Sequence, residues 1–531
     1  MRPRKIWGWG YEGERADPRA LAFAEASLSA LLGGPAPGPL APPSADAVPV
    51  PASRMPESTP IERLLERSSH ERLVHALGRS YRDLARAVRG VFPHVPDAVA
   101  VPRSEDDLVQ LCEIASARQI ALVPFGGGTS VAGGVEPEVG SRFSAALSVD
   151  LRAMSGLLEL DEQSLAARFG AGTLGPDLEA ALRPKGLTLR HFPQSFELST
   201  LGGWVATRAG GHFATVYTHI DDLVESVSVV TPAGKLETRR LPGSGAGPAP
   251  ERLFIGSEGA FGFITSAWVR LFERPRHRAS ATVSFERFEV GLEALRRLVQ
   301  SGLSPSNCRL IDGAEAIMSG AGAFDANLLL LAFESAHHPQ DGLLAQALGV
   351  VKDAGGVVAE GAVQSTFDAS GGRDATADTY KASFFRGPYL RDELVLRGVF
   401  VETYETAAPW AMIPALDEAV RRAVAALELG PHLLARRVTH AYRDGCAPYY
   451  TVIARAREGA EEAMWRDVKA AITDAIVAAG GTSTHHHAIG RDVVPWHEKE
   501  TAPLFREGLR AVKATLDPAG VMNPGALLRE R

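Results

Sequence analysis

Three consecutive histidines, His485, His486 and His487, stand late in the chain within the segment THHHAIG. The ordinary pKa of histidine lies close to neutral pH, so such a cluster suits proton transfer or metal binding. The preceding segment AAITDAIVAAGG is typical of a helix that ends at its glycines, and we expect the histidines on the strand that follows. There His485 and His487 would share one face and His486 the other. The alternative is a polar strand end or an adventitious metal site.

A glycine-rich segment, PFGGGTSVAGG at residues 124–134, is the second chemical feature. Adjacent glycines let the backbone approach a ligand closely, and their N–H groups can converge on an anion such as a pyrophosphate. The spacing is that of neither a Walker loop nor a Rossmann fingerprint, and a flexible turn is the alternative interpretation. Two more small-residue segments, 192–211 and 254–271, are expected as loops in strand-like context that could pack against a planar ligand.

Composition limits the function classes. A chain of 531 residues, 45% of them hydrophobic, can form two or three domains with sizeable cores. The net charge of -7 gives no basic field for nucleic acid, so no nucleic-acid partner is expected. Three widely spaced cysteines argue against a disulfide framework and fit a reducing compartment. An apolar run of about 18 residues, which a membrane span needs, is not found, nor is a hydrophobic signal core.

The order of patterns along the chain predicts an α+β protein. A proline-rich connector at 33–59 precedes a charged helical stretch at 61–90. Strands and helices then alternate to about residue 274, and a second α+β mixture with long Ala-rich helices follows to about residue 480. Ser104 and Asp107 form a capping-box pattern at the start of one helix. The predicted units are an N-terminal extension, a first domain, a second domain and a C-terminal segment: 1–93, 94–274, 275–495 and 496–531.

The three glycine-rich segments together resemble the flavoproteins of the vanillyl-alcohol oxidase and p-cresol methylhydroxylase type. This resemblance implies a two-subdomain FAD-binding domain with an α+β substrate domain as its cap. It also implies that the C-terminal segment packs back on the FAD-binding domain. FAD is expected to be non-covalent, because no cysteine lies near these segments. Gln194, Ala260 and Phe261 depart from the commoner residues but leave the glycines in place. The residues that the resemblance assigns to FAD are Pro124, Phe125, Gly126, Gly127, Gly128, Thr129, Ser130, Gln194, Ser195, Ser199, Thr200, Gly202, Gly203, Trp204, Thr207, Glu258, Gly259, Gly262 and Ile264.

Further motifs narrow the resemblance to the alkyldihydroxyacetonephosphate synthase (alkylglycerone-phosphate synthase) family. They are IWGWGYEGE at 6–14, SNCRLIDG at 306–313, the segments 389–410 and 437–451, and the histidine run. Ala488 stands where synthases usually carry glycine. The resemblance implies an FAD-dependent transferase of ether-lipid synthesis. It exchanges the acyl group of acyl-dihydroxyacetone phosphate for a long-chain fatty alcohol through a flavin N(5) adduct, without net redox.

Such chemistry needs proton-transfer groups and a cation for the phosphate, and the resemblance supplies candidates. Tyr449 would be an acid/base whose pKa a neighbouring cation lowers, and the histidines centred on His486 would activate the alcohol. Arg391 would bind the phosphate, while Arg309 would orient the histidine segment without touching substrate. The bland alternatives are an ordinary strand aromatic for Tyr449 and an ion pair with Asp392 for Arg391. No metal is expected.

Two other functions stay open. An FAD-dependent D-2-hydroxyacid dehydrogenase or oxidase on the same fold would use an arginine and a histidine base, and this chain could supply both. A non-catalytic lipid- or flavin-binding module is the third interpretation. For the synthase, we expect a cytoplasmic, bacterial protein at a membrane periphery, without a peroxisomal signal. A homodimer is compatible with this interpretation.

Overall fold

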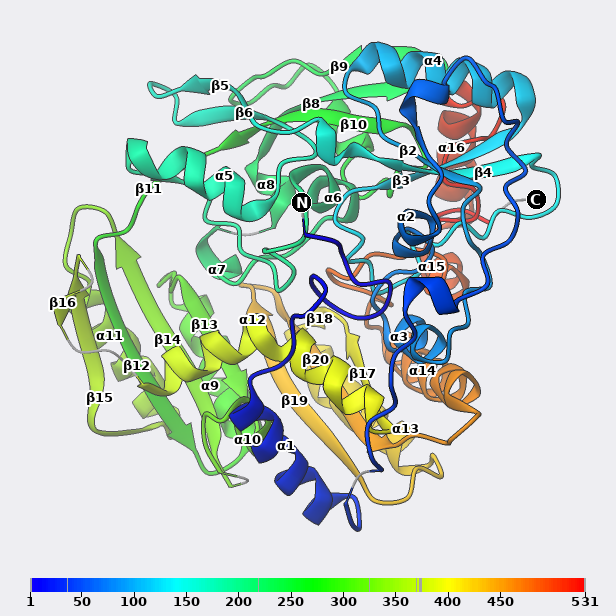
Figure 1. Cartoon of the computed structure of the whole chain (residues 1–531). Coiled ribbons are helices and arrows are strands. Elements are labelled where there is room, and N and C mark those ends of the chain that lie inside the picture. Colours follow the sequence, from blue (N-terminus) through cyan, green and yellow to red (C-terminus); the bar gives the residue numbers. More distant parts are fainter. Residues whose placement is uncertain are drawn as a thin grey trace.

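The computed structural model describes residues 2–35, 37–217, 219–323, 325–368, 370–371 and 375–529. Two sheets and their helices form one half of the molecule, and one long sheet with its helices forms the other (Figure 1). Both helices and strands are abundant in each half, so the predicted α+β class is confirmed.

The first sheet carries the glycine-rich segment at the end of a buried strand. In the described part of the chain its strand order is β1-β2-β4-β3, with β2 and β3 parallel to β4. Helix α4, Glu105–Arg118, begins at the expected Ser104–Asp107 capping box. The strands are β1 Leu65–Glu66, β2 Ala98–Ala100, β3 Ile120–Phe125 and β4 Ala145–Asp150.

The second sheet has the order β5-β6-β10-β8-β9 and lies beside the first. Its strands are β5 Leu157–Asp161, β6 Ala166–Gly170, β8 Val224–Thr231, β9 Gly234–Glu237 and β10 Phe263–Arg270, with a separate pair of β7 Leu187–Thr188 and β11 Phe272–Glu273. Its helices are α5 Gly175–Leu182, α6 Leu201–Thr207, α7 Ala214–Tyr217 and α8 Ile220–Leu223. The prediction of a loop through residues 201–207 is therefore wrong. The Thr200 hydroxyl accepts the N–H of Gly203 and caps a helix there.

The third sheet forms the cap. Its order in the described residues is β16-β15-β12-β14-β13-β19-β20-β17, with β18 beside β20. The strands are β12 His277–Phe285, β13 Asn307–Ile311, β14 Asn327–Ser335, β15 Val357–Phe367, β16 Ser370–Gly371, β17 Val399–Glu405, β18 Ala408–Pro409, β19 His432–Ala441 and β20 Gly445–Arg455. Alternate residues of each strand face opposite sides, so Leu329 and Leu331 of β14 join one core while Leu328 and Leu330 join another.

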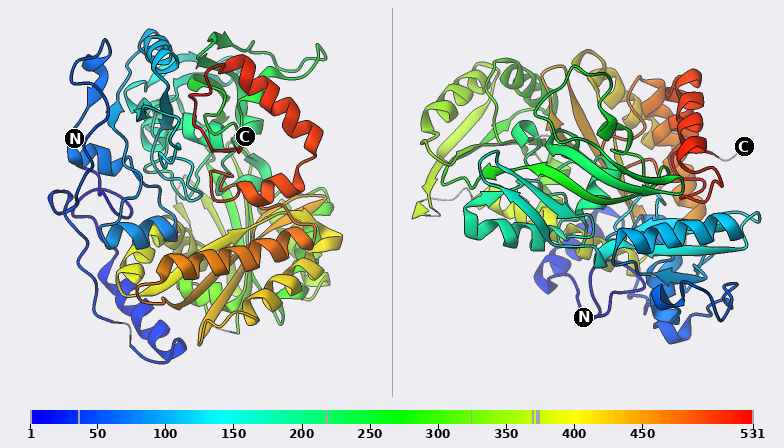
Figure 2. Two further views of the ribbon diagram at one scale, coloured as in Figure 1. Left: turned by 90° about the vertical axis from the view of Figure 1, so that its right-hand side faces the viewer. Right: turned by 90° about the horizontal axis from the view of Figure 1, so that it is seen from above.

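Helices cover both faces of the cap sheet. The larger core holds the apolar faces of α9 Phe288–Gln300, α11 Asp341–Asp353, α13 Ile413–Ala425 and α14 Glu461–Ala478. The opposite core holds α10 Gly313–Ser319 and α12 Ala375–Leu396. Figure 2 shows α13 and α14 side by side beneath the first half of the molecule.

The N-terminal and C-terminal segments contain further helices outside the main sheets. The charged helical stretch at 61–90 forms η2 Glu62–Leu64, α2 Ser69–Val74 and α3 Tyr81–Val88, and Ser68 and Ser80 cap the two helices. The other N-terminal elements are α1 Pro18–Leu31 and η1 Ala45–Ala47. At the far end, α15 Val494–Glu500 and α16 Pro503–Leu516 lead to Met522, which forms a parallel bridge with Leu122 (Figure 2). The remaining 3-10 turns are η3 Leu151–Ala153, η4 Arg183–Lys185, η5 Pro250–Leu253 and η6 Trp410–Met412.

Candidate active site

One cavity is lined by residues from both halves of the molecule. All of the residues assigned to FAD from the sequence line it, from Pro124 in the glycine-rich segment to Ile264 on β10. Arg309, Arg391, Tyr449, His486 and His487 line the same cavity, whereas His485 stands behind it. The cap therefore places these side chains next to the glycine-rich segment 124–134 and the loop around Thr200, which form a glycine-lined cradle.

The cradle is built so that only glycine fits. A Cβ on Gly127 would lie 2.0 Å from the carbonyl oxygen of Leu198, and one on Gly126 would lie 2.3 Å from Oγ1 of Thr200. Gly128 has φ +66, a backbone conformation that glycine adopts without strain. The two loops can meet this closely because side chains are missing, which leaves a wall of backbone and small residues. Such a wall suits the pyrophosphate and flat ring of FAD.

The histidine run is a loop and not the expected strand. The carboxylate of Glu405, at the end of β17, accepts hydrogen bonds from the N–H groups of His485 at 2.7 Å and His487 at 3.0 Å. It also accepts the N–H of His486 at 3.0 Å and the Thr484 hydroxyl at 2.6 Å. On a strand, successive N–H groups point in opposite directions and could not converge in this way. The buried carboxylate therefore curls the backbone around itself.

The loop is fixed at its other end by a second buried carboxylate. Glu258 in the FAD cradle accepts the N–H of Ile489 at 2.8 Å and that of Gly490 at 2.6 Å. Between the two anchors, Ala488 has φ +73, which is strained for a residue with a Cβ. Glycine at this position would adopt the conformation freely.

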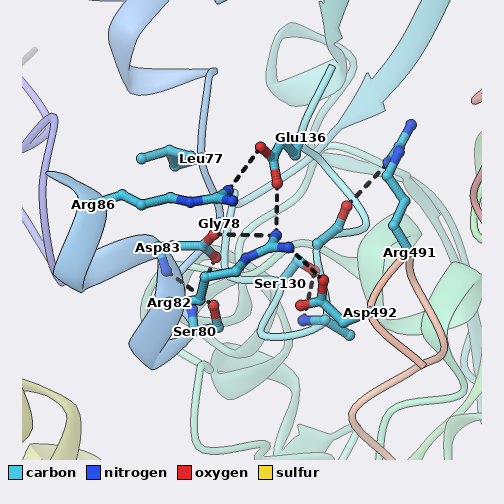
Figure 3. A network of polar contacts seen from close by, with 12 residues as sticks. Leu77, Gly78, Ser80, Arg82, Asp83, Arg86, Ser130, Glu136, Arg491 and Asp492 are labelled. Atoms are coloured by element: carbon cyan, nitrogen blue, oxygen red, sulfur yellow. Dashed lines mark hydrogen bonds and ion pairs between the residues drawn. The ribbon is translucent and has the colours of Figure 1, made fainter. Parts of the chain in front are cut away.

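A network of charged side chains ties this loop to the rest of the cradle (Figure 3). Arg82 on α3 lies 2.6 Å from Glu136, just past the glycine-rich segment, and 2.8 Å from Asp492, just past the histidine loop. Arg491 donates to the carbonyl oxygen of Gly133 at 3.0 Å. Segments far apart in sequence are thus held together beside the glycine-rich segment of the cavity.

Two further histidines and a tyrosine lie close to the histidine run in the fold. The hydroxyl of Tyr442 lies 2.8 Å from Nε2 of His485 and 2.5 Å from Nε2 of His219. The His440 ring packs 5.0 Å from that of His485. Sequence reasoning missed all three side chains. Tyr442 and His440 lie within the quoted motif at 437–451 and could have been examined, but His219 lies in the first half of the molecule and carries no local signal.

The ring nitrogens of His440, His485 and His486 lie within 4.8 Å of one another, a spacing that could hold a metal ion. Several of these nitrogens already form hydrogen bonds with other groups of the protein. In His440, Nε2 lies 3.2 Å from the Gly211 carbonyl oxygen and Nδ1 lies 2.9 Å from the Thr439 hydroxyl. The arrangement therefore works as a hydrogen-bonded cluster without a metal.

Burial sets the charge of the cluster. It lowers the pKa of His487 to about 3 and holds those of His485 and His440 well below the ordinary value, so these rings are neutral at pH 7. Burial alone would raise the pKa of Glu405, but the neighbouring histidines, His486 first, outweigh it and hold that pKa well below its ordinary value. Glu405 is therefore the fixed negative charge of the loop.

Tyr449 lies on β20 with its ring against the histidines. Its ring centroid is 6.1 Å from that of His486 in a stacked arrangement. The guanidinium carbon of Arg437, another residue missed in the sequence, lies 3.8 Å from the Tyr449 centroid. We expected a cation to lower the pKa of Tyr449, but burial raises it despite Arg437. At neutral pH this hydroxyl is a proton donor at rest.

Two arginines face the cavity with unused donors. Arg391 lies 3.7 Å from Asp392, too far for a hydrogen bond, and its Nε and Nη2 have no hydrogen-bond partner among the described residues. Asp392 instead accepts the backbone N–H of Trp9, a further cavity residue. Arg309 donates from Nη2 to the carbonyl oxygen of His212 at 3.4 Å and leaves Nε and Nη1 without such a partner.

Comparisons with known proteins agree with this geometry. Residues 96–239 match the family model of the FAD binding domain, and residues 274–527 match that of the FAD linked oxidases, C-terminal domain. FAD is therefore the cofactor of this chain.

Several relatives share nearly the whole chain. An alkyldihydroxyacetonephosphate synthase of Trypanosoma brucei brucei is 32% identical over 476 residues, which cover 87% of this chain and 78% of that protein. One of Dictyostelium discoideum is 30% identical over 473 residues, 86% of this chain and 77% of that protein. A solved structure of alkyldihydroxyacetonephosphate synthase aligns over 98% of each chain with a TM-score of 0.81 and 24% identity, which shows the same fold. The chain belongs to the alkyldihydroxyacetonephosphate synthase family.

Proposed function

We propose that this protein makes the ether bond of ether lipids, as the resemblance implies, by exchanging the acyl group of acyl-dihydroxyacetone phosphate for a fatty alcohol. The observation that carries the proposal is the meeting of the FAD cradle, Tyr449, His486 and two incompletely bonded guanidinium groups around one cavity. When bound, FAD supplies the ring at which the two chains are exchanged. The protein supplies charge, orientation and proton transfer.

Arg391 is proposed to bind the substrate phosphate. A buried guanidinium with unused donors is costly unless a ligand completes its hydrogen bonds, and a phosphate offers the matching acceptors. The alternative, an ion pair with Oδ1 of Asp392, exists at 3.7 Å but leaves Nε and Nη2 of Arg391 without a hydrogen bond, so it does not use up the donors of this guanidinium.

Tyr449 and His486 are proposed as the proton-transfer groups. Tyr449 holds its proton at neutral pH and can donate it as a bond to the acyl oxygen breaks. Nδ1 of His486 lies 3.2 Å from Oε2 of Glu405, which leaves Nε2 as the nitrogen that can take the alcohol proton. The negative charge of Glu405 then stabilises the imidazolium that forms.

The test is incubation of the purified protein with acyl-dihydroxyacetone phosphate and a labelled fatty alcohol, followed by lipid analysis. We expect labelled alkyl-dihydroxyacetone phosphate and free fatty acid in equal amounts. The rival dehydrogenase function predicts instead that D-lactate or D-2-hydroxyglutarate bleaches the yellow flavin and that no ether lipid forms. Acid denaturation tests the non-covalent state of FAD, and we expect all yellow colour in the supernatant.

The substrates suggest contact with a membrane. Both carry long apolar chains that partition into lipid, yet among the described residues no helix has the length and apolarity needed to cross a bilayer. We therefore propose peripheral docking, with delivery by micelles or a carrier protein as the alternative. Flotation with neutral and anionic liposomes distinguishes the two: docking predicts protein in the floating fraction, and delivery predicts that active protein stays at the bottom.

A further inference from the structure

A continuous row of hydrogen-bonding side chains leads away from the cavity. Nδ1 of His486, a cavity residue, lies 2.9 Å from Nδ1 of His485, and Nε2 of His485 lies 2.8 Å from the Tyr442 hydroxyl. That hydroxyl lies 2.5 Å from Nε2 of His219. Every separation is within the range of a hydrogen bond, so the row has no gap.

One arrangement of protons satisfies the whole row. If Nδ1 of His486 carries a hydrogen, Nδ1 of His485 at 2.9 Å and Oε2 of Glu405 at 3.2 Å share it as acceptors, and the Nε2–H of His485 donates to Tyr442. The tyrosine hydroxyl in turn donates to His219. Each member accepts on one side and donates on the other, which is the condition for passing a proton along by successive short transfers. His440 stands outside the row, because its nitrogens contact Gly211 and Thr439 instead.

The row joins a closed site to the surface. His486 is flanked by the buried Glu405 and Tyr449, whereas Tyr442 and His219 are partly exposed. Tyr442 follows the end of β19 in the cap, and His219 immediately precedes α8 in the FAD-binding half. The outer end of the row therefore lies where the two halves of the molecule meet.

The charges around the outer end favour release and not storage of a proton. Burial lowers the pKa of His219, and the neighbouring His486 lowers it further, while Asp221 acts in the opposite direction. Arg208 lies 3.0 Å from Asp221 and partly cancels that carboxylate. The ring of His219 is partly exposed beside the backbone of Arg208 and does not retain an added proton at neutral pH, so it can release that proton to solvent.

The proposed reaction requires such an exit, and the inference rests on that function. The acyloxy group leaves as a fatty acid, and the alcohol oxygen takes its place on the same carbon while its O–H bond breaks. Tyr449 takes back the proton that it lends to the acyloxy group, so the fatty acid leaves as a carboxylate and the alcohol proton is the one net proton released in each turnover. This proton first appears on a base beside the alcohol, inside the cavity.

We propose that His485, Tyr442 and His219 form a relay that carries the alcohol proton from His486 to solvent. The alcohol proton binds Nε2 of His486, and the Nδ1 proton of His486 moves to His485. The Nε2 proton of His485 moves to Tyr442, whose own proton moves to His219 and then to water. Deprotonation of the alcohol and proton release are then separate events at opposite ends of the row.

The test uses the FAD-loaded enzyme with Tyr442→Phe and His219→Gln. Phenylalanine keeps the ring and removes the hydroxyl, and glutamine keeps a hydrogen-bonding group that cannot take a proton. We expect kcat for ether formation to fall at least about tenfold in each variant in dilute buffer, with KM for both substrates unchanged. A stopped-flow pH indicator should show proton release that lags product in the variants but coincides with it in the wild type. Added imidazole should restore kcat in both variants and leave the wild-type value unchanged.

Tyr450→Phe is the matched control, because that hydroxyl bonds Asp417 on the opposite face of β20. It should lose some stability and show neither the lag nor the rescue. Wild-type kcat in both relay variants would overturn the relay, as would a loss of kcat that imidazole does not restore. A wild-type enzyme that forms no ether product would instead refute the proposed function, so the two failures are distinguishable.

Discussion

The carboxylate of Glu405 holds His486 twice, once through the backbone and once through the ring. Its Oε2 accepts the His486 N–H at 3.0 Å and lies 3.2 Å from Nδ1 of the same residue. One buried charge therefore sets both the path of the loop and the orientation of the imidazole. This is the role that a carboxylate plays toward the histidine of a hydrolytic triad, reached here on a different fold.

Glu405→Gln should weaken the positioning of the loop and of the His486 imidazole without preventing FAD binding. Glutamine keeps one acceptor and adds an N–H₂ group that faces the N–H groups of the loop. We expect FAD to remain bound and kcat for ether formation to fall on the order of 100-fold or more. The free energy of unfolding should fall by about 1–3 kcal/mol at pH 7.

The stability loss in this variant should depend on pH. The pKa of Glu405 is held below its ordinary value of 4.5, so its charge stabilises the fold above that pH and the effect disappears as pH falls through the lower native pKa. The difference in Tm between wild type and Glu405→Gln should therefore shrink in acid. A constant difference between pH 7 and pH 3 would contradict this account.

Tyr449→Phe tests the proton donor. The variant should fold and bind FAD, because the ring still packs against Arg437 and His487. Ether formation should fall by a factor on the order of 100 or more, since a hydroxyl that holds its proton at neutral pH is lost. Tyr450→Phe serves here too as the control, and equal activity of the two variants would show that Tyr449 is an ordinary strand aromatic.

Arg391→Lys tests the phosphate site. Lysine keeps the positive charge but loses the planar fork, so the apparent KM for acyl-dihydroxyacetone phosphate should rise about tenfold or more with a smaller change in kcat. Arg386→Lys on the same helix is the control, because that side chain is exposed and lies 3.9 Å from Glu197. An unchanged KM in Arg391→Lys would place the phosphate elsewhere.

The sequence predicts the FAD cradle well because its residues act through short contiguous segments. The glycines at 126–128 and the loop around Thr200 carry their function in local backbone geometry, which residue types reveal directly. The partners of the histidines cannot be predicted in this way. Glu405 precedes His486 by a long stretch of chain, and His219 lies in the other half of the molecule, so only tertiary packing brings them together.

The expected strand at 484–488 failed for the same reason. Alternation assumes that the backbone N–H groups bond neighbouring strands, whereas here three of them bond a single carboxylate. The positive φ of Ala488 is a further consequence, since the chain must turn sharply between Glu405 and Glu258. Neither carboxylate is near the loop in sequence, so no local pattern could have indicated them.

Ala488→Gly should relieve this strain. A left-handed residue with a Cβ costs about 1–2 kcal/mol, and the extra freedom of glycine in the unfolded chain offsets about 0.5–1 kcal/mol of the gain. We expect the variant to be as stable as the wild type or up to about 1 kcal/mol more stable, as measured by denaturant unfolding. Ala471→Gly within α14 is the control and should lose about 1 kcal/mol, because its backbone is helical. A similar loss at both positions would contradict the strain at Ala488.

Glu258→Gln should change how the stability of the protein responds to pH. Burial raises the pKa of Glu258 to about 7, although the N–H groups of Ile489 and Gly490 act against it. A carboxyl group with a raised native pKa stabilises the fold below its ordinary value of 4.5, and that contribution is lost as pH rises through about 7. The wild-type Tm should therefore carry a component that declines between pH 5 and pH 8. Glutamine does not titrate, so this component should be absent in the variant, whereas Glu237→Gln on the exposed β9 should retain it. Parallel Tm curves for wild type and Glu258→Gln would show that the carboxyl group is already ionised at pH 5, and that both loop N–H groups bond a full negative charge throughout.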